Sequence, residues 1–226
     1  MAMTLAEANS LTFGAEGQHK ARDAKQSLLV ACLLTMSGGF LDAYAWLSFG
    51  GVFANSQTGN VVFLGMYVAL GKWGEAFHHV PPILSFLAGA GVASRVRAPL
   101  LCLWGEILSL AVVMLWLRSH PELAIIGISF GVALQATSFR QVDRWKYLSV
   151  TVTGNLLRAV DQIALPANSE SVRGARTLLI ICGMFLLGAA TGGPMATHWP
   201  GVALLVPIGL SMCALWFCYR SGRRTT

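Results

Sequence analysis

Eight apolar runs constrain the fold of this chain more than any other feature. They cover residues 28–50, 52–71, 81–94, 99–117, 121–139, 147–166, 177–195 and 200–219. A helix needs about 20 residues to cross a bilayer. Hydrophobic residues make up 55% of the chain and charged residues 12%, and the mean hydropathy is +0.61. This composition excludes a soluble domain and predicts an all-α polytopic helix bundle in a lipid bilayer.

Charge and cysteine patterns narrow the functional classes. The net charge is +6, but the basic residues lie between apolar runs and form no single basic face, so nucleic acid is not expected as a partner. The five cysteines fall inside apolar runs without metal-ligand spacing, so no metal or cofactor is expected. Known catalytic motifs are absent from the sequence, which favours a protein that is not an enzyme. A membrane-embedded enzyme stays open as a weaker alternative.

A tripeptide occurs twice, as Thr58-Gly59-Asn60 and as Thr153-Gly154-Asn155. Each copy follows a hydrophobic segment that carries one polar residue after a stretch of small residues. That residue is Asp42 in the first half, 16 positions before Thr58, and Gln135 in the second half, 18 positions before Thr153. The spacing indicates a weak duplication of roughly half the chain.

The loop charges distinguish two membrane topologies. If all eight runs cross and the N-terminus is inside, ten basic residues lie inside and five outside. If runs 52–71 and 147–166 instead enter and leave on one side, thirteen lie inside and only Lys72 and Arg118 lie outside. The second arrangement satisfies the positive-inside rule better. It also gives the two halves opposite orientations, as in inverted repeats.

The sequence therefore predicts six spanning helices plus two re-entrant half helices. Seven or eight ordinary spans remain the alternative, because residues 61–70 are apolar enough to span. The predicted units are a cytoplasmic tail, a first membrane repeat, a second membrane repeat and a C-terminal cytoplasmic tail, over residues 1–26, 27–118, 119–220 and 221–226. Small residues spaced by four in two of the runs predict close helix packing. These are Ser85, Gly89 and Ala93, and Gly188 with Gly192.

The two tripeptides predict a binding site near the middle of the membrane. Thr58 and Thr153 are good N-cap residues, each followed by glycine and an apolar helical run. A helix that begins inside a bilayer leaves N–H groups unpaired, and the glycine permits close approach. The amides of Asn60 and Asn155 would add donors and acceptors facing one point. The alternative is an N-cap and a helix-crossing glycine with no ligand.

Asp42 and Glu106 are candidate coupling carboxylates because both fall inside predicted spans. Asp42 has two other interpretations: it caps the helix that begins near Thr58, or it pairs with Arg158. Gln135, its counterpart in the second half, cannot titrate. The two halves are therefore not chemically equivalent if Asp42 carries a proton or cation.

Arg158 would place a positive charge beside the second tripeptide and favour an anionic solute. Asp161, three residues later, could instead neutralise it. His78 and His79 are expected in an interfacial loop rather than as ligands.

The stretch Gly39-Phe40-Leu41-Asp42-Ala43, followed by Gly51-Val52-Phe53-Ala54-Asn55 and the two T-G-N copies, resembles the YoaK family of uncharacterised bacterial membrane proteins. The likeness covers about residues 27–220. It implies a bacterial inner-membrane protein with several spans, and it supplies no activity.

The residues themselves favour a secondary transporter or channel for a small polar or anionic solute, bound between the two T-G-N helix starts. The alternative is a membrane scaffold or accessory subunit whose polar residues only lock helices together. The expected partners are the lipid bilayer and a small solute or ion, and a homo-oligomer is left open.

Overall fold

The computed structural model describes residues 27–117, 120–164 and 169–223, so the predicted tail 1–26 and the end of the predicted C-terminal tail lie outside the described residues. The first half contains α2 (Leu28–Ser48), α3 (Gln57–Ala69), α4 (Trp73–His78), α5 (Val80–Val96), α6 (Pro99–Val112) and the π-helical turn η1 (Val113–Leu117). The second half contains α7 (Pro121–Ser138), β1 (Gln141–Val142), β2 (Trp145–Lys146), α8 (Thr153–Ala164), α9 (Ser169–His198) and α10 (Leu205–Arg223). The described chain is a helix bundle, as the composition predicts.

Within the described residues, five helical segments are long and apolar enough to cross a membrane. They are Leu28–Ser48, Trp73–Val96, Pro99–Trp116, Pro121–Ser138 and Ser169–His198, and Leu205–Arg220 is a shorter apolar helix. In contrast, α3 has 13 residues and α8 has 12. At about 1.5 Å per residue, neither reaches across the ~30 Å hydrocarbon core of a bilayer. Apolar runs 52–71 and 147–166 each begin with a non-helical stretch and continue as a short helix.

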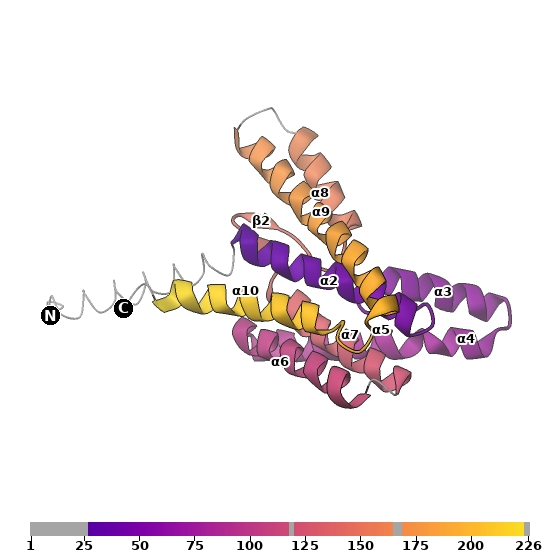
Figure 1. Ribbon diagram of the computed structural model, residues 1–226. Coiled ribbons are helices and arrows are strands. Elements are labelled where there is room, and N and C mark those ends of the chain that lie inside the picture. The colour runs from indigo at the N-terminus through magenta and orange to yellow at the C-terminus, as the bar shows by residue number, and fades with distance from the viewer. Residues whose placement is uncertain (1–26, 118–119, 165–168, 224–226) are drawn as a thin grey trace, which may run out of the picture.

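The packing exchanges helices between the two halves of the chain. The main buried core lies among α2, α6, α7 and α10. α2 packs most extensively against α9 and then against α10, whereas α7 packs against α5 and α6. Figure 1 shows α9 crossing α2, while α3 and α4 extend from one end of the bundle. The first helix of each half is thus covered by the last two long helices of the other half.

α2 and α9 touch through their backbones. A Cβ atom on Gly188 would lie 2.0 Å from the carbonyl oxygen of Met36, and one on Gly39 would lie 2.0 Å from that of Phe185. Gly192 faces α2 in the same way, at the next turn of α9. Only residues without a side chain allow helices to approach this closely. The predicted packing role of Gly188 and Gly192 is confirmed.

The second small-residue stripe packs α5 against α7. A Cβ atom on Gly89 would lie 2.5 Å from the carbonyl oxygen of Phe130. The Ser85 hydroxyl donates a hydrogen bond to the carbonyl oxygen of Ile126 at 2.6 Å, and Ala93 is buried. This predicted packing role is also confirmed.

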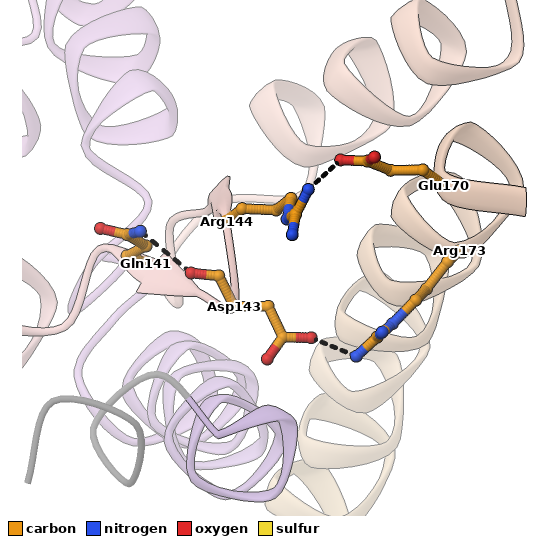
Figure 2. Close-up of polar contacts among 5 residues, drawn as sticks. All are labelled: Gln141, Asp143, Arg144, Glu170 and Arg173. Carbon is orange, nitrogen blue, oxygen red and sulfur yellow. Dashed lines mark hydrogen bonds and ion pairs between the residues drawn. The ribbon is translucent and has the colours of Figure 1, made fainter. Parts of the chain in front are cut away.

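A short antiparallel hairpin, formed by β1 and β2, connects α7 to the loop before α8, and the sequence analysis did not predict it. Figure 2 shows its turn reaching α9: Arg144 pairs with Glu170 at 2.6 Å, and Asp143 pairs with Arg173 at 2.8 Å. The Gln141 amide donates to the Asp143 carbonyl oxygen. Exposed ion pairs contribute about 1 kcal/mol or less each, so their role is to position the start of α9.

Two glycines of α9 provide a matched test of the α2–α9 contact. Gly188→Ala should lower the free energy of unfolding by about 1–3 kcal/mol, because the new methyl group overlaps the Met36 carbonyl group. Gly183→Ala should leave it unchanged or raise it by up to about 1 kcal/mol, because nothing lies within 4 Å of that Cβ position. Thermal unfolding of both variants in detergent would measure the difference. Equal midpoints for the two variants would contradict the backbone contact.

Candidate functional site

The asparagine of each T-G-N copy binds the backbone of the residue seven positions earlier. Asn60 Nδ2 donates to the Phe53 carbonyl oxygen at 2.9 Å, and Asn60 Oδ1 accepts the Phe53 N–H at 3.0 Å. Asn155 makes the same two bonds to Leu148, at 2.7 and 3.0 Å. Each amide thus pairs with the N–H and the carbonyl group of one loop residue, as a residue on a neighbouring β-strand would. We call these two pairs the asparagine clamps.

The remaining donors of the clamps are also used inside the chain. Asn60 Nδ2 donates a second bond to Gln57 Oε1 at 2.9 Å, and Asn155 Nδ2 donates a second bond to the Thr151 carbonyl oxygen at 2.9 Å. An amide nitrogen has two hydrogens, so neither side chain keeps a donor for a solute. The prediction that both amides face a central ligand is therefore wrong in this conformation. Their geometry is that of loop supports.

The threonines of the two copies do not cap the short helices. Thr58 is the second residue of α3, whose N-cap residue is Ser56, and Thr153 is the first residue of α8. Both threonine side chains are exposed. The predicted N-cap role of Thr58 is wrong, because α3 begins one residue earlier, at Gln57. The Asp42 carboxylate accepts hydrogen bonds from Asn55 and Ser56, just before the helix.

The glycines of the two copies differ in their surroundings. A Cβ atom on Gly59 would lie 2.6 Å from the ring of Phe53, so close approach requires glycine there, as predicted. The Gly154 carbonyl oxygen accepts a hydrogen bond from Arg158 Nη1 at 3.2 Å. In the described residues, Arg158 makes no ion pair with Asp161 or with Asp42. Its guanidinium group thus remains a positive charge beside the start of α8.

Asp42 is buried in α2 and binds the loop before α3. Its Oδ1 atom accepts the N–H of Asn55 at 2.9 Å and that of Ser56 at 3.3 Å, and its Oδ2 atom accepts the Ser56 hydroxyl. A carboxylate at a helix N-terminus also interacts favourably with the helix dipole. Of the interpretations of Asp42, that of a residue that caps the helix near Thr58 agrees with these contacts.

The loops before α3 and α8 meet at Gly38 of α2. A Cβ atom on Gly38 would lie 3.2 Å from Asn55 Nδ2 and 2.7 Å from the Ser149 carbonyl oxygen. These distances add to 5.9 Å, so the two atoms are no farther apart than that. Asn55 Nδ2 also donates to the Gly38 carbonyl oxygen at 2.9 Å. The absence of a side chain at Gly38 therefore makes room for both loops.

Gln135 of α7 completes this group from the other half of the chain. Its Oε1 atom lies 3.5 Å from the Ser149 hydroxyl, a long hydrogen bond. We call Asp42, Asn55, Gln135 and Ser149 the central polar cluster; each is at most 4% exposed. Gln135 Nε2 and Asn55 Oδ1 have no hydrogen-bond partner in the part of the chain that the structure describes. The same is true of Thr35 Oγ1, one helical turn before Gly38 on α2.

Glu106 of α6 faces Ser211 of α10. It is fully buried, and its Oε2 atom accepts a hydrogen bond from the Ser211 hydroxyl at 2.9 Å. Its Oε1 atom has no partner among the described residues. Within those residues, no group of three or more His, Cys, Asp or Glu side chains is arranged to hold a metal ion.

The structure identifies functional candidates that the sequence analysis missed. Asn55 and Ser149 belong to the central polar cluster. The asparagine clamps were also missed, and the signal for them was the equal spacing of seven residues from Phe53 to Asn60 and from Leu148 to Asn155. The expected interfacial loop at His78 and His79 is wrong. His78 ends α4 and binds the Phe49 carbonyl oxygen at 2.8 Å, and His79 is buried.

Comparison with known proteins gives the chain a family. A family model described as a protein of unknown function (DUF1275) matches residues 30–217. The chain belongs to this family. The UPF0700 transmembrane protein YoaK of Bacillus subtilis (strain 168) is 23% identical over 148 residues, covering 58% of this chain and 65% of YoaK. No solved structure matches the chain.

These matches confirm the resemblance to the YoaK family, although the chain aligns with slightly less than two thirds of the length of YoaK. The transmembrane relative and the long apolar helices together place this DUF1275 protein in a membrane.

The asparagine clamps can be tested by stability. Asn155→Ala should lower the free energy of unfolding by about 2–5 kcal/mol, because it leaves the N–H and carbonyl groups of Leu148 unpaired. Asn60→Ala should have a similar effect through Phe53. Thr153→Ala, at an exposed position of α8, is the control and should change the value by less than about 0.5 kcal/mol. Chemical unfolding in detergent gives all three values, and a neutral Asn155→Ala would contradict the clamp.

Proposed function

We propose that this DUF1275 protein is a secondary transporter or channel for a small polar or anionic solute, and that the solute passes the central polar cluster. The observation that carries the proposal is the set of buried polar atoms without partners: Gln135 Nε2, Asn55 Oδ1 and Thr35 Oγ1. Burying an unpaired polar group costs about 1–3 kcal/mol, so such a set is costly to keep inside a membrane protein. A passing solute would supply the missing partners.

We further propose that the chain is an inverted repeat of six spanning helices and two half helices in a bacterial inner membrane, with both termini in the cytoplasm. Three observations support this proposal: α3 and α8 are too short to span, both asparagine clamps have one geometry, and the halves exchange helices. In Figure 1 the start of α2, the end of α10 and the hairpin lie toward the same end of the bundle. The hairpin region is rich in basic residues, namely Arg140, Arg144 and Lys146, as a cytoplasmic end would be.

The two halves would contribute different chemistry to the solute site. Asp42 uses both carboxylate oxygens to hold the loop before α3, so its role is to position Asn55. Gln135 has a free amide donor beside the loop before α8, and Arg158 adds a positive charge at the start of that helix. The second half therefore favours an anion near the start of α8. In the first half the Asp42 carboxylate itself supplies the negative charge near the start of α3. Of the two coupling candidates, Glu106 keeps one oxygen without a partner among the described residues, whereas both oxygens of Asp42 are bound.

A membrane scaffold is the second candidate function. The observation that favours it is that Asp42, Asn60 and Asn155 spend their hydrogen bonds on the chain itself. In that case the polar residues lock loops in place, and no solute crosses. The two functions differ in whether flux exists at all.

Solute flux separates them. Proteoliposomes containing the dye pyranine should take up at least one of radiolabelled phosphate, lactate, glutamate and the neutral probe glycerol faster than protein-free liposomes. Gln135→Leu should reduce that uptake about tenfold or more, because it removes the free amide donor and replaces it with a side chain of similar size. Thr153→Ala, which alters an exposed side chain outside the cluster, should transport normally. Internal pH, reported by the dye, shows whether protons move with the solute.

The result that overturns transport is uptake no faster than in protein-free liposomes for all four solutes. If Asp42→Asn then only lowers the unfolding temperature, the scaffold is favoured.

The membrane side of Glu75 tests the half-helix topology separately. Glu75 lies in α4, immediately after α3, and its side chain is exposed. In Glu75→Cys, an impermeant maleimide should label intact cells above the wild-type background from outside, because a re-entrant α3 returns the chain to that side. Labelling that requires permeabilised cells would show that residues 52–71 cross the membrane fully.

A further inference from the structure

A cavity of about 560 Å³ lies between the end of α2, α3 and α4, and none of its lining residues belongs to the central polar cluster. Its lining includes the rings of Trp46, Phe63, Tyr67 and His79, and the carboxylate of Glu75. Its volume lies within the range of about 300–1,000 Å³ that is usual for small-molecule sites. Aromatic rings with a few placed polar groups are also typical of such sites.

The aromatic part of the cavity is a continuous group of rings. The centroid of His79 lies 5.4 Å from that of Phe63 and 5.8 Å from that of Tyr67, with interplanar angles of 14° and 20°. Trp46 extends the group, at 5.4 Å from Phe63. The rings therefore form one packed group, and their mutual packing reduces the entropy that a ligand must remove.

The glycine turn at the end of α2 forms another side of the cavity. Gly50 and Gly51 have φ values of 71° and 81°, a conformation that other residues rarely adopt. The His78 imidazole binds the carbonyl oxygen of Phe49, and a Cβ atom on Gly50 would lie 3.0 Å from His78 Nε2. The turn therefore allows the His78 imidazole to pack closely against the backbone of Gly50.

The titratable side chains that line the cavity are Tyr67, Glu75, His78 and His79. His79 Nδ1 lies 3.4 Å from Asn60 Oδ1, an atom that can only accept, so the imidazole proton is assigned to Nδ1. Nε2 of His79 then carries a lone pair. Among the residues that line the cavity, which are all described, Glu75 is the only acidic or basic residue other than the two histidines. The cavity thus combines aromatic rings, two imidazole groups and one negative charge.

We propose that this cavity binds an organic ammonium ion that carries an aromatic or other apolar group. The ammonium group interacts with the Glu75 carboxylate and with the aromatic rings, as cations do in aromatic sites of other proteins. The apolar group fills the remaining space between Trp46 and Tyr67.

The proposed ligand site goes beyond the proposed transport function, but it contacts the same loop. Trp46 stacks on Phe53 at 4.7 Å, and His79 contacts Asn60, which clamps the backbone of Phe53. A ligand in the cavity would therefore contact residues that pack against the loop that carries Asn55. Ligand binding is nevertheless independent of whether any solute crosses the membrane.

Three probes of one shape and different charge test the proposal. Phenethylammonium, phenethyl alcohol and phenylpropionate should be titrated into the full chain in detergent, with binding measured by calorimetry. Phenethylammonium should bind most tightly. Glu75→Gln and Tyr67→Leu should each weaken its binding about two- to thirtyfold. Glu122→Gln, an exposed carboxylate on α7 outside the cavity, is the matched control and should bind the ammonium ion as the wild type does.

Three results would overturn the proposal. The first is no binding of phenethylammonium, and the second is binding of phenylpropionate or phenethyl alcohol as tight as that of phenethylammonium. The third is an unchanged affinity in Glu75→Gln, whose exposed side chain makes a folding defect an unsatisfactory explanation. A transport assay that fails would leave both measurements valid.

Discussion

Asn60 and Asn155 each satisfy both backbone groups of one loop residue, and the central part of the molecule depends on this pairing. A loop inside a membrane protein has no water to bind its N–H and carbonyl groups, so another polar group must replace the water. An asparagine amide matches a peptide group in shape and in hydrogen bonds. Because the amide comes from the first turn of α3 or α8, it fixes the loop and the helix together.

The two halves share this support but differ in the polar side chain that contacts each loop. In the first half Asp42 satisfies donors of the loop before α3 by accepting three hydrogen bonds from it. In the second half Gln135 makes one long bond to Ser149 and keeps a free donor. The two loops thus share the same asparagine support, while a carboxylate in one half and an amide in the other make the two sides of the central polar cluster unequal.

Close helix packing brings these parts together. Gly38 makes room for both loops on α2, and Gly39, the next residue, allows α9 to approach on another face. Two adjacent glycines in one helix therefore perform separate tasks. The exchange of helices between the halves follows, because α2 is covered by α9 and α10 and α7 by α5 and α6.

The sequence by itself determined the membrane helices and the small-residue contacts, because hydropathy and side-chain size depend on residue type alone. It also indicated Asp42 and Gln135 as central residues. Only the tertiary structure decided that Asn60 and Asn155 support loops instead of facing a ligand, since hydrogen-bond partners depend on where a loop folds back. For the same reason the burial of His79 against Phe63 became visible only when α3 and α4 lay side by side.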